Sequence, residues 1–141
     1  MPVKTASARY EGLGKEGRGF ISTQSGALAE QPYGFGTRFE DQAGSNPEEL
    51  IAAAHAACFT MATSFALARA GYSDGVLDTG CAITLSQAEG GFAVTQSALT
   101  LSATIPGITA EDFERIADEA KANCPISKLL NCPITLTREL A

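Results

Sequence analysis

The sequence predicts an α+β fold, and three observations carry this prediction. Segments in which polar and apolar residues alternate, as in strands with one buried face, occur near both ends of the chain and in its middle. A long segment with almost no charge has the signals of a helix start before it and a glycine after it. A second helical segment, apolar on one face, precedes the last alternating segment. The predicted order is βββ-α-ββ-α-β, in a single domain that spans residues 1–141.

The N-terminal part predicts a β-hairpin. Residues 5–10 and 18–23 are the two strands, and the glycine-rich stretch 11–17 is the turn between them. Residues 31–39, which contain three aromatic side chains and two glycines, predict either a short third strand or an extended loop.

The central helix has clear start and stop signals. Ser45 or Asn46 can cap its first turn, and Ser45 with Glu48 also matches a capping box. The next residue, Glu49, adds a second acid that complements the helix dipole. We expect the helix to continue to about residue 70 and to end at Gly71.

Residues 50–68 of this helix are almost uncharged, and apolar side chains surround the helix instead of forming a narrow stripe. The segment is long enough to span a bilayer. However, it contains one histidine and several hydroxyl side chains, and two acids precede it, so we interpret it as the buried helix of a soluble protein. A helix buried on most sides in so short a chain indicates neighbours from a second subunit.

The C-terminal half predicts a hairpin, two helices and a last strand. Thr109 is the expected cap of the first of these helices, and a proline ends that helix before the second begins. The predicted strands cover residues 77–88, 91–104 and 134–140, and the predicted helices cover 110–122 and 126–130.

Composition narrows the class of protein. The chain has 141 residues, of which 45% are hydrophobic and 18% charged, which is typical of a globular protein. Its formal net charge of −6 argues against non-specific nucleic-acid binding. The N-terminus lacks the apolar stretch of a secretory signal, so we expect a cytoplasmic protein whose cysteines stay reduced unless they take part in chemistry.

Two of the four cysteines stand out. Cys124 precedes a proline at the start of a predicted helix, where backbone N–H groups and the helix dipole lower the pKa of a thiol. Cys58 lies inside the central helix and has no such aid. A cation would have to activate it, and Arg38 is the best candidate, with Glu48 as a carboxylate that can orient its guanidinium.

Helix geometry constrains this group. Glu48 and Cys58 are ten residues apart, which is about 15 Å along a continuous helix. They cannot both serve one compact site in the same chain. If Glu48 takes part, it must come from a partner subunit.

Each of these residues also has an ordinary explanation. A cysteine in a helix usually packs, an arginine in a loop usually lies on the surface, and Glu48 can serve as a helix-start acid alone. His55 lies one turn before Cys58, so it either pairs with that thiol or is a buried histidine satisfied by a hydrogen bond. His55, Cys58 and Cys124 could together bind a metal, although no spacing here matches a zinc motif.

Taken together, these residues resemble a known family. Residues 31–40 read QPYGFGTRFE, residues 46–59 read NPEELIAAAHAACF, and residues 124–127 read CPIS. The combination resembles the osmotically inducible protein C (OsmC) family, which is related to the organic hydroperoxide resistance proteins. The resemblance covers essentially the whole chain.

The resemblance implies an intertwined homodimer in which two sheets surround the central helices. It also implies a thiol-dependent peroxidase that prefers organic hydroperoxides to hydrogen peroxide and acts in oxidative or osmotic stress. By position, Cys58 is the peroxidatic cysteine, Cys124 the resolving cysteine, Arg38 the activating cation and Glu48 the acid that holds it. Cys81 and Cys132 do not belong to the family pattern.

The same resemblance implies a cycle without a metal or organic cofactor. A sulfenic acid on Cys58 condenses with Cys124, and a dithiol, of the lipoyl type in this family, reduces the disulfide. The expected substrate-contacting side chains are Tyr33, Phe35, Phe39, Phe59, Met61 and Ile126. The alternatives are a non-catalytic stress protein whose cysteines pack, and a metal-binding module.

Overall fold

The computed structural model describes residues 1–141 and confirms the α+β prediction and the predicted order of the main elements. The chain divides into two compact units, Met1–Leu50 and Ile51–Ala141. Each unit is described by itself below.

The first unit is built on a three-stranded antiparallel sheet. Strand β1 (Ala6–Glu11) pairs with β2 (Arg18–Thr23), and β2 pairs on its other edge with β3 (Gln31–Tyr33). The turn between β1 and β2 contains a short 3-10 helix, Gly14–Glu16. The predicted hairpin is therefore present.

The segment that carries Arg38 differs from the prediction. Residues 31–39 do contain a short strand, but the strand stops at Tyr33 and the chain then forms a helical turn, α1 (Phe35–Phe39). The Gly34 N–H donates to Thr37 Oγ1 at 2.9 Å, and the Thr37 hydroxyl donates back to the Gly34 carbonyl at 3.1 Å. This local pairing closes the turn, so Arg38 lies on a short helix instead of an extended loop.

The central helix, α2 (Pro47–Arg69), begins and ends where the sequence predicts. Asn46 is the residue that caps it, since its Oδ1 accepts the Glu49 N–H at 2.8 Å. The capping box with Ser45 is absent because the Glu48 carboxylate binds Arg38 instead. At the other end, Gly71 adopts a φ of 99°, which lets the chain reverse after the last turn.

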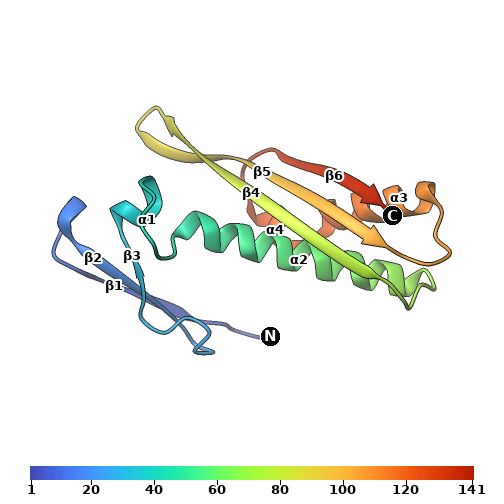
Figure 1. Ribbon diagram of the computed structural model, residues 1–141, viewed down its shortest axis with the longest axis horizontal. Coiled ribbons are helices and arrows are strands. Elements are labelled where there is room, and N and C mark those ends of the chain that lie inside the picture. The colour runs from blue at the N-terminus through green and yellow to red at the C-terminus, as the bar shows by residue number, and fades with distance from the viewer. The chain divides into compact units, whose positions relative to one another are not determined.

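The second unit contains the other sheet, with strand order β4-β5-β6 (Figure 1). Strand β4 (Val76–Ala88) pairs antiparallel with β5 (Gly91–Thr104), and β6 (Ile134–Leu140) lies parallel to β5. The parallel pairing requires a crossover, which is supplied by α3 (Ala110–Asn123) and α4 (Pro125–Leu129).

One hydrophobic core joins α2, β5 and α3. Alternate residues of β5 face it, as expected of a strand with one buried side. The cap of α3 is the predicted one, with Thr109 Oγ1 accepting the Asp112 N–H at 3.1 Å. The fully or nearly buried core residues are Phe59, Leu67, Leu99, Leu101, Ala103, Ile105, Phe113, Ile116, Ala117, Ala120 and Cys124.

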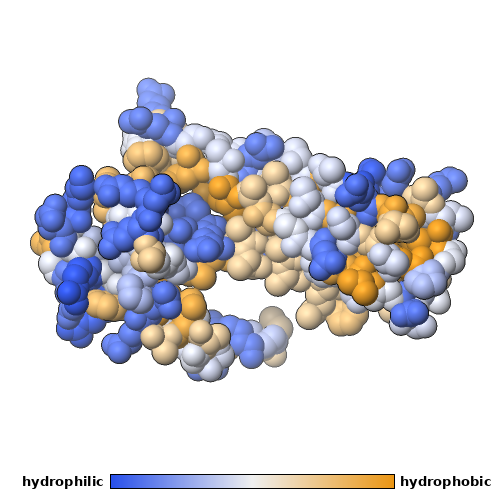
Figure 2. Space-filling view, viewed as in Figure 1, coloured by the Kyte–Doolittle hydropathy of each residue, from blue (hydrophilic) through white to orange (hydrophobic).

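Helix α2 is less buried within one chain than the sequence predicts. Its buried residues form a single stripe with a spacing of four: His55, Phe59, Thr63 and Leu67. By contrast, Met61 is 60% exposed and Phe65 is 59% exposed. Figure 2 shows apolar surface along the exposed part of this helix. The helix is long and apolar enough to cross a membrane by length and composition alone, a test that core helices of soluble proteins also pass.

Candidate functional site

Two cysteines from distant parts of the sequence meet in the second unit. Cys58 lies in the middle of α2 and is partly exposed, whereas Cys124 is fully buried and occupies the residue that starts α4. Their side chains are within hydrogen-bonding reach of each other, and both are free thiols. The fold therefore places two free thiols where they can hydrogen-bond to each other.

The two thiols differ in acidity. Burial raises the pKa of Cys58, and the hydrogen bond with Cys124 raises it further. Burial also opposes ionisation of Cys124, but hydrogen bonds from Cys58, from the N–H and hydroxyl of Ser127 and from the Ile126 N–H lower its pKa overall. This agrees with the predicted effect of a helix start on Cys124. With these groups alone, Cys124 is therefore the more acidic thiol of the pair.

The first unit contains an arginine that is paired with a carboxylate. Arg38 binds the Glu48 carboxylate through Nε at 3.0 and 3.1 Å and through its NH2 nitrogen at 2.6 Å. The hydrogen bonds that Arg38 donates to Glu48 raise the pKa of Arg38, so the guanidinium keeps its charge. The Glu48 side chain is only 13% exposed and that of Arg38 is 38% exposed. The contact suggested by the sequence is thus formed, and part of the guanidinium remains open to a ligand.

Aromatic side chains lie close to this ion pair in the first unit. The Phe35 and Phe39 rings are 5.1 Å apart, and the Arg38 guanidinium lies 5.3 Å from the centre of the Phe39 ring. Tyr33 and Phe35 also line a cavity of about 240 Å³. These three aromatic residues therefore remain candidates for contact with an apolar substrate.

The other predicted substrate contacts lie in the second unit and divide into two kinds. Phe59 is fully buried in the hydrophobic core, so we assign it to packing and not to substrate binding. Ile126 is partly buried against the core directly after the Cys124-Pro125 pair, and Met61 lies on the exposed face of α2. Only Ile126 and Met61 therefore have surface that a substrate could contact.

The sequence analysis did not indicate the hydrogen-bond partners of His55. His55 is fully buried, and its Nδ1 lies 2.6 Å from Ser97 Oγ while its Nε2 lies 2.8 Å from Ser127 Oγ. Cys81 Sγ lies 3.3 Å from Ser97 Oγ. Of the two interpretations of His55, the structure supports the buried histidine whose ring nitrogens are hydrogen-bonded. Because both nitrogens are engaged, the ring is not available to a metal. A polar residue among the alternating apolar residues of β5 was the signal that could have revealed Ser97.

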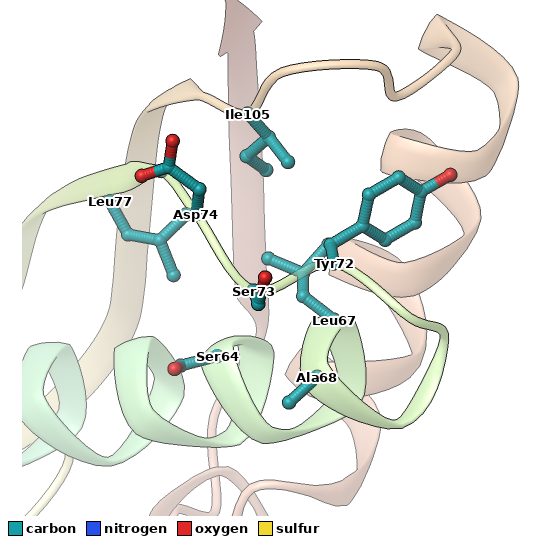
Figure 3. Close-up of a pocket in the computed structure, with 9 residues that line it drawn as sticks. Ser64, Leu67, Ala68, Tyr72, Ser73, Asp74, Leu77 and Ile105 are labelled. Carbon is teal, nitrogen blue, oxygen red and sulfur yellow. The ribbon is translucent and has the colours of Figure 1, made fainter.

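A separate pocket of about 300 Å³ lies at the C-terminal end of α2 (Figure 3). Side chains of α2, of the loop after it and of the neighbouring strands line it, among them Ser64, Tyr72 and Asp74. No cysteine and no arginine belongs to it, so it lacks the groups that thiol redox chemistry requires.

A pair of contacting thiols, one of them acidified at a helix start, defines the class as a thiol-based redox protein. Residues 39–139 match the family described as OsmC-like protein, and the chain belongs to this family. Peroxiredoxin OsmC of Escherichia coli strain K12 is 49% identical over 137 residues, which cover 97% of this chain and 96% of that protein.

More distant relatives agree. An organic hydroperoxide resistance protein of Xanthomonas axonopodis pv. citri is 31% identical and covers 97% of this chain and 94% of its own length. The crystal structure of an organic hydroperoxide resistance protein from Elizabethkingia anophelis superposes with a TM-score of 0.73, at 28% identity and with 99% of each chain covered. These likenesses identify the chain as a peroxidase of the OsmC and organic hydroperoxide resistance group.

Proposed function

We propose that this enzyme reduces organic hydroperoxides to alcohols through Cys58 and Cys124. The observation that carries the proposal is the meeting of these two thiols in one unit. The Cys58 thiolate attacks the O–O bond, one oxygen leaves as the alcohol after taking up a proton, and Cys58 becomes a sulfenic acid. The Cys124 thiolate then attacks the Cys58 sulfur, the S–S bond forms, and the hydroxyl leaves with a proton as water.

The reductant proposed for the next step is a dithiol. A dithiol of the lipoyl type attacks the Cys58–Cys124 disulfide and leaves as its own disulfide, which restores both thiols. Each step of the proposed cycle, including the reduction by the dithiol, is sulfur chemistry. We place the protein in the cytoplasm as a soluble enzyme of oxidative or osmotic stress defence.

The proposed partner is a second copy of this chain. Met61 and Phe65 give α2 an exposed apolar face. In a dimer, the central helices of the two subunits can bury these faces against each other, between the two sheets. In such an intertwined homodimer, the Arg38–Glu48 pair of one subunit reaches Cys58 of the other. The guanidinium then stabilises the Cys58 thiolate, which moves the shared proton to Cys124.

Substrate preference tests the proposed function. With a lipoyl-type dithiol as reductant, we expect kcat/KM for cumene or tert-butyl hydroperoxide to exceed that for hydrogen peroxide by about tenfold or more, because an apolar group of this size contributes about that much discrimination in an apolar pocket. Steady-state kinetics with all three peroxides measures it. Equal values for the three would contradict an organic hydroperoxide as the substrate.

The trans arrangement predicts complementation between two inactive variants. In a heterodimer of Glu48→Ala and Cys58→Ser subunits, one site keeps both an intact Glu48 and an intact Cys58, so we expect up to half of the wild-type activity per dimer. The activity of purified heterodimers carrying two different tags measures this. Heterodimers of Cys58→Ser and Cys124→Ser are the matched control, because no subunit then keeps both cysteines and no activity should return. Inactive Glu48→Ala/Cys58→Ser heterodimers would show that Glu48 does not act across the interface.

A further inference from the structure

The buried His55 is the centre of a chain of hydrogen-bonding side chains that ends at the resolving thiol. The chain runs from Cys81 through Ser97, His55 and Ser127, with separations of 3.3, 2.6 and 2.8 Å. Ser127 is the third residue of α4, and Cys124 is the residue that starts this helix. The serine therefore stands beside the Cys124 sulfur.

Counting donors and acceptors fixes the direction of each hydrogen bond between Cys81 and Cys124. To stabilise the Cys124 thiolate, the Ser127 hydroxyl must donate to the sulfur, and its oxygen is then free only to accept. His55 must therefore carry its ring proton on Nε2 and donate it to Ser127. The bare Nδ1 accepts the Ser97 hydroxyl, whose oxygen accepts the Cys81 S–H. Every donor then has one acceptor, and successive bonds polarise one another toward Cys124.

The state of the imidazole is consistent with this direction. Burial lowers the pKa of His55, so the ring is neutral at pH 7 and has one donor and one acceptor nitrogen. The groups that bear on Cys124 are Cys58 from α2 and the first-turn groups of α4, among which the Ser127 hydroxyl lowers its pKa. No charged side chain contributes to that shift.

We propose that His55 is a positioning residue for the resolving step, acting through Ser127 to favour the Cys124 thiolate once Cys58 has been oxidised. This inference rests on the proposed peroxidase cycle and adds a division of labour to it. The attack on peroxide depends on the cation near Cys58. The closure of the disulfide depends on the hydrogen bonds that run from His55 through Ser127 to Cys124. Loss of His55 or Ser127 should therefore slow disulfide closure and leave the attack on peroxide intact, so that sulfenic acid accumulates on Cys58.

Two measurements test this without any peroxide. In wild-type protein, ¹⁵N NMR of His55 should show a protonated Nε2 and a bare Nδ1, and the opposite tautomer would overturn the proposal. In reduced protein with ¹³Cβ-labelled cysteine, Ser127→Ala and His55→Leu should each raise the pKa of Cys124 by about one unit, the effect of losing one hydrogen bond to the charged form. An unchanged Cys124 pKa in both would also overturn it.

Kinetics supplies the third readout and the controls. After one equivalent of cumene hydroperoxide, Ser127→Ala and His55→Leu should close the disulfide about tenfold more slowly at pH 7, in line with a shift of one pKa unit. His55→Gln, which places an amide N–H near the position of Nε2, should restore much of the rate. Thr63→Val is the matched control, since Thr63 is a buried polar residue of α2 whose hydroxyl bonds only the Phe59 carbonyl, at 2.8 Å.

The outcomes separate the two proposals. Equal closure rates in wild type and in both network variants would overturn the role of His55 while leaving the peroxidase intact. If no peroxide is consumed by any variant or by wild type, the proposed function fails, and the NMR tautomer and the Cys124 titration still decide whether His55 acts on Cys124.

Discussion

Replacing Cys58 by serine is expected to reduce peroxide turnover to the uncatalysed background. A serine hydroxyl is not ionised near pH 7, so the nucleophile is lost. It also cannot take up the peroxide oxygen as the cysteine sulfur does, so the sulfenic acid intermediate is lost. Consumption of cumene hydroperoxide in the presence of a dithiol measures the effect. We expect it to be the largest effect of any single substitution in this chain.

Cys124→Ser is the informative comparison for this variant. Without the resolving thiol, one equivalent of peroxide should still be consumed, and a dimedone adduct should then form on Cys58. Cys132→Ser is the control, because Cys132 lies in the segment between α4 and β6 and has no part in the proposed cycle. Substantial turnover in Cys58→Ser would show that another group performs the chemistry.

Replacing Arg38 by alanine is expected to have the second largest effect. Within its own unit, burial and the hydrogen bond with Cys124 raise the pKa of Cys58 and outweigh the lowering by the Ile126 N–H, so we expect the activating charge to come from Arg38. An adjacent cation lowers the pKa of an acid by about 1–3 units, so its loss should cut the thiolate fraction near pH 7 by about ten- to a thousandfold. The rate constant for the reaction of reduced enzyme with peroxide measures this loss.

The pH profile separates lost charge from lost structure. A raised Cys58 pKa leaves less thiolate at neutral pH, so the rate in Arg38→Ala should keep rising with pH beyond the point at which the wild-type rate levels off. Arg138→Ala is the matched control, since Arg138 also forms a two-point ion pair, with Asp118 at 2.9 Å for both contacts. A wild-type profile in Arg38→Ala would contradict the role of this arginine.

Much of the fold was predictable because its signals are local. From Ser97 to Thr104, β5 alternates between buried and more exposed residues. Thr109 and Gly71 mark helix boundaries by chemistry that acts within a few residues. The helical turn that carries Arg38 was missed because it depends on the paired hydrogen bonds between Gly34 and Thr37. Glycine and aromatic residues in that segment are equally compatible with an extended chain.

The candidate site was less accessible to local reasoning. The sequence indicated the Arg38–Glu48 contact through charge, and it indicated the acidity of Cys124 through its place before a helix. It could not assign His55, because Ser97 is 42 residues away along the chain and Ser127 is 72 residues away. Only tertiary packing brings such groups together. Phe59 shows the reverse case, since a composition that suits a substrate pocket suits a core equally well.

The difference in acidity between the two thiols bears on the role proposed for Arg38. Cys124 gains its acidity from the hydrogen bond with Cys58 and from the groups that follow it in the chain, whereas burial and the hydrogen bond with Cys124 raise the pKa of Cys58. In the proposed cycle, the charge of Arg38 reverses this order and makes Cys58 the nucleophile that attacks the peroxide. In the same proposal, the hydrogen bonds through Ser127 then favour the Cys124 thiolate that closes the disulfide.

Intact and peptide mass spectrometry of the oxidised, unreduced protein tests the central claim most directly. After one equivalent of cumene hydroperoxide, with free thiols blocked, the account predicts the loss of two hydrogens and a single disulfide-linked peptide pair that joins Cys58 to Cys124. Four free thiols after peroxide, or a disulfide that joins other cysteines in the wild-type protein, would contradict it.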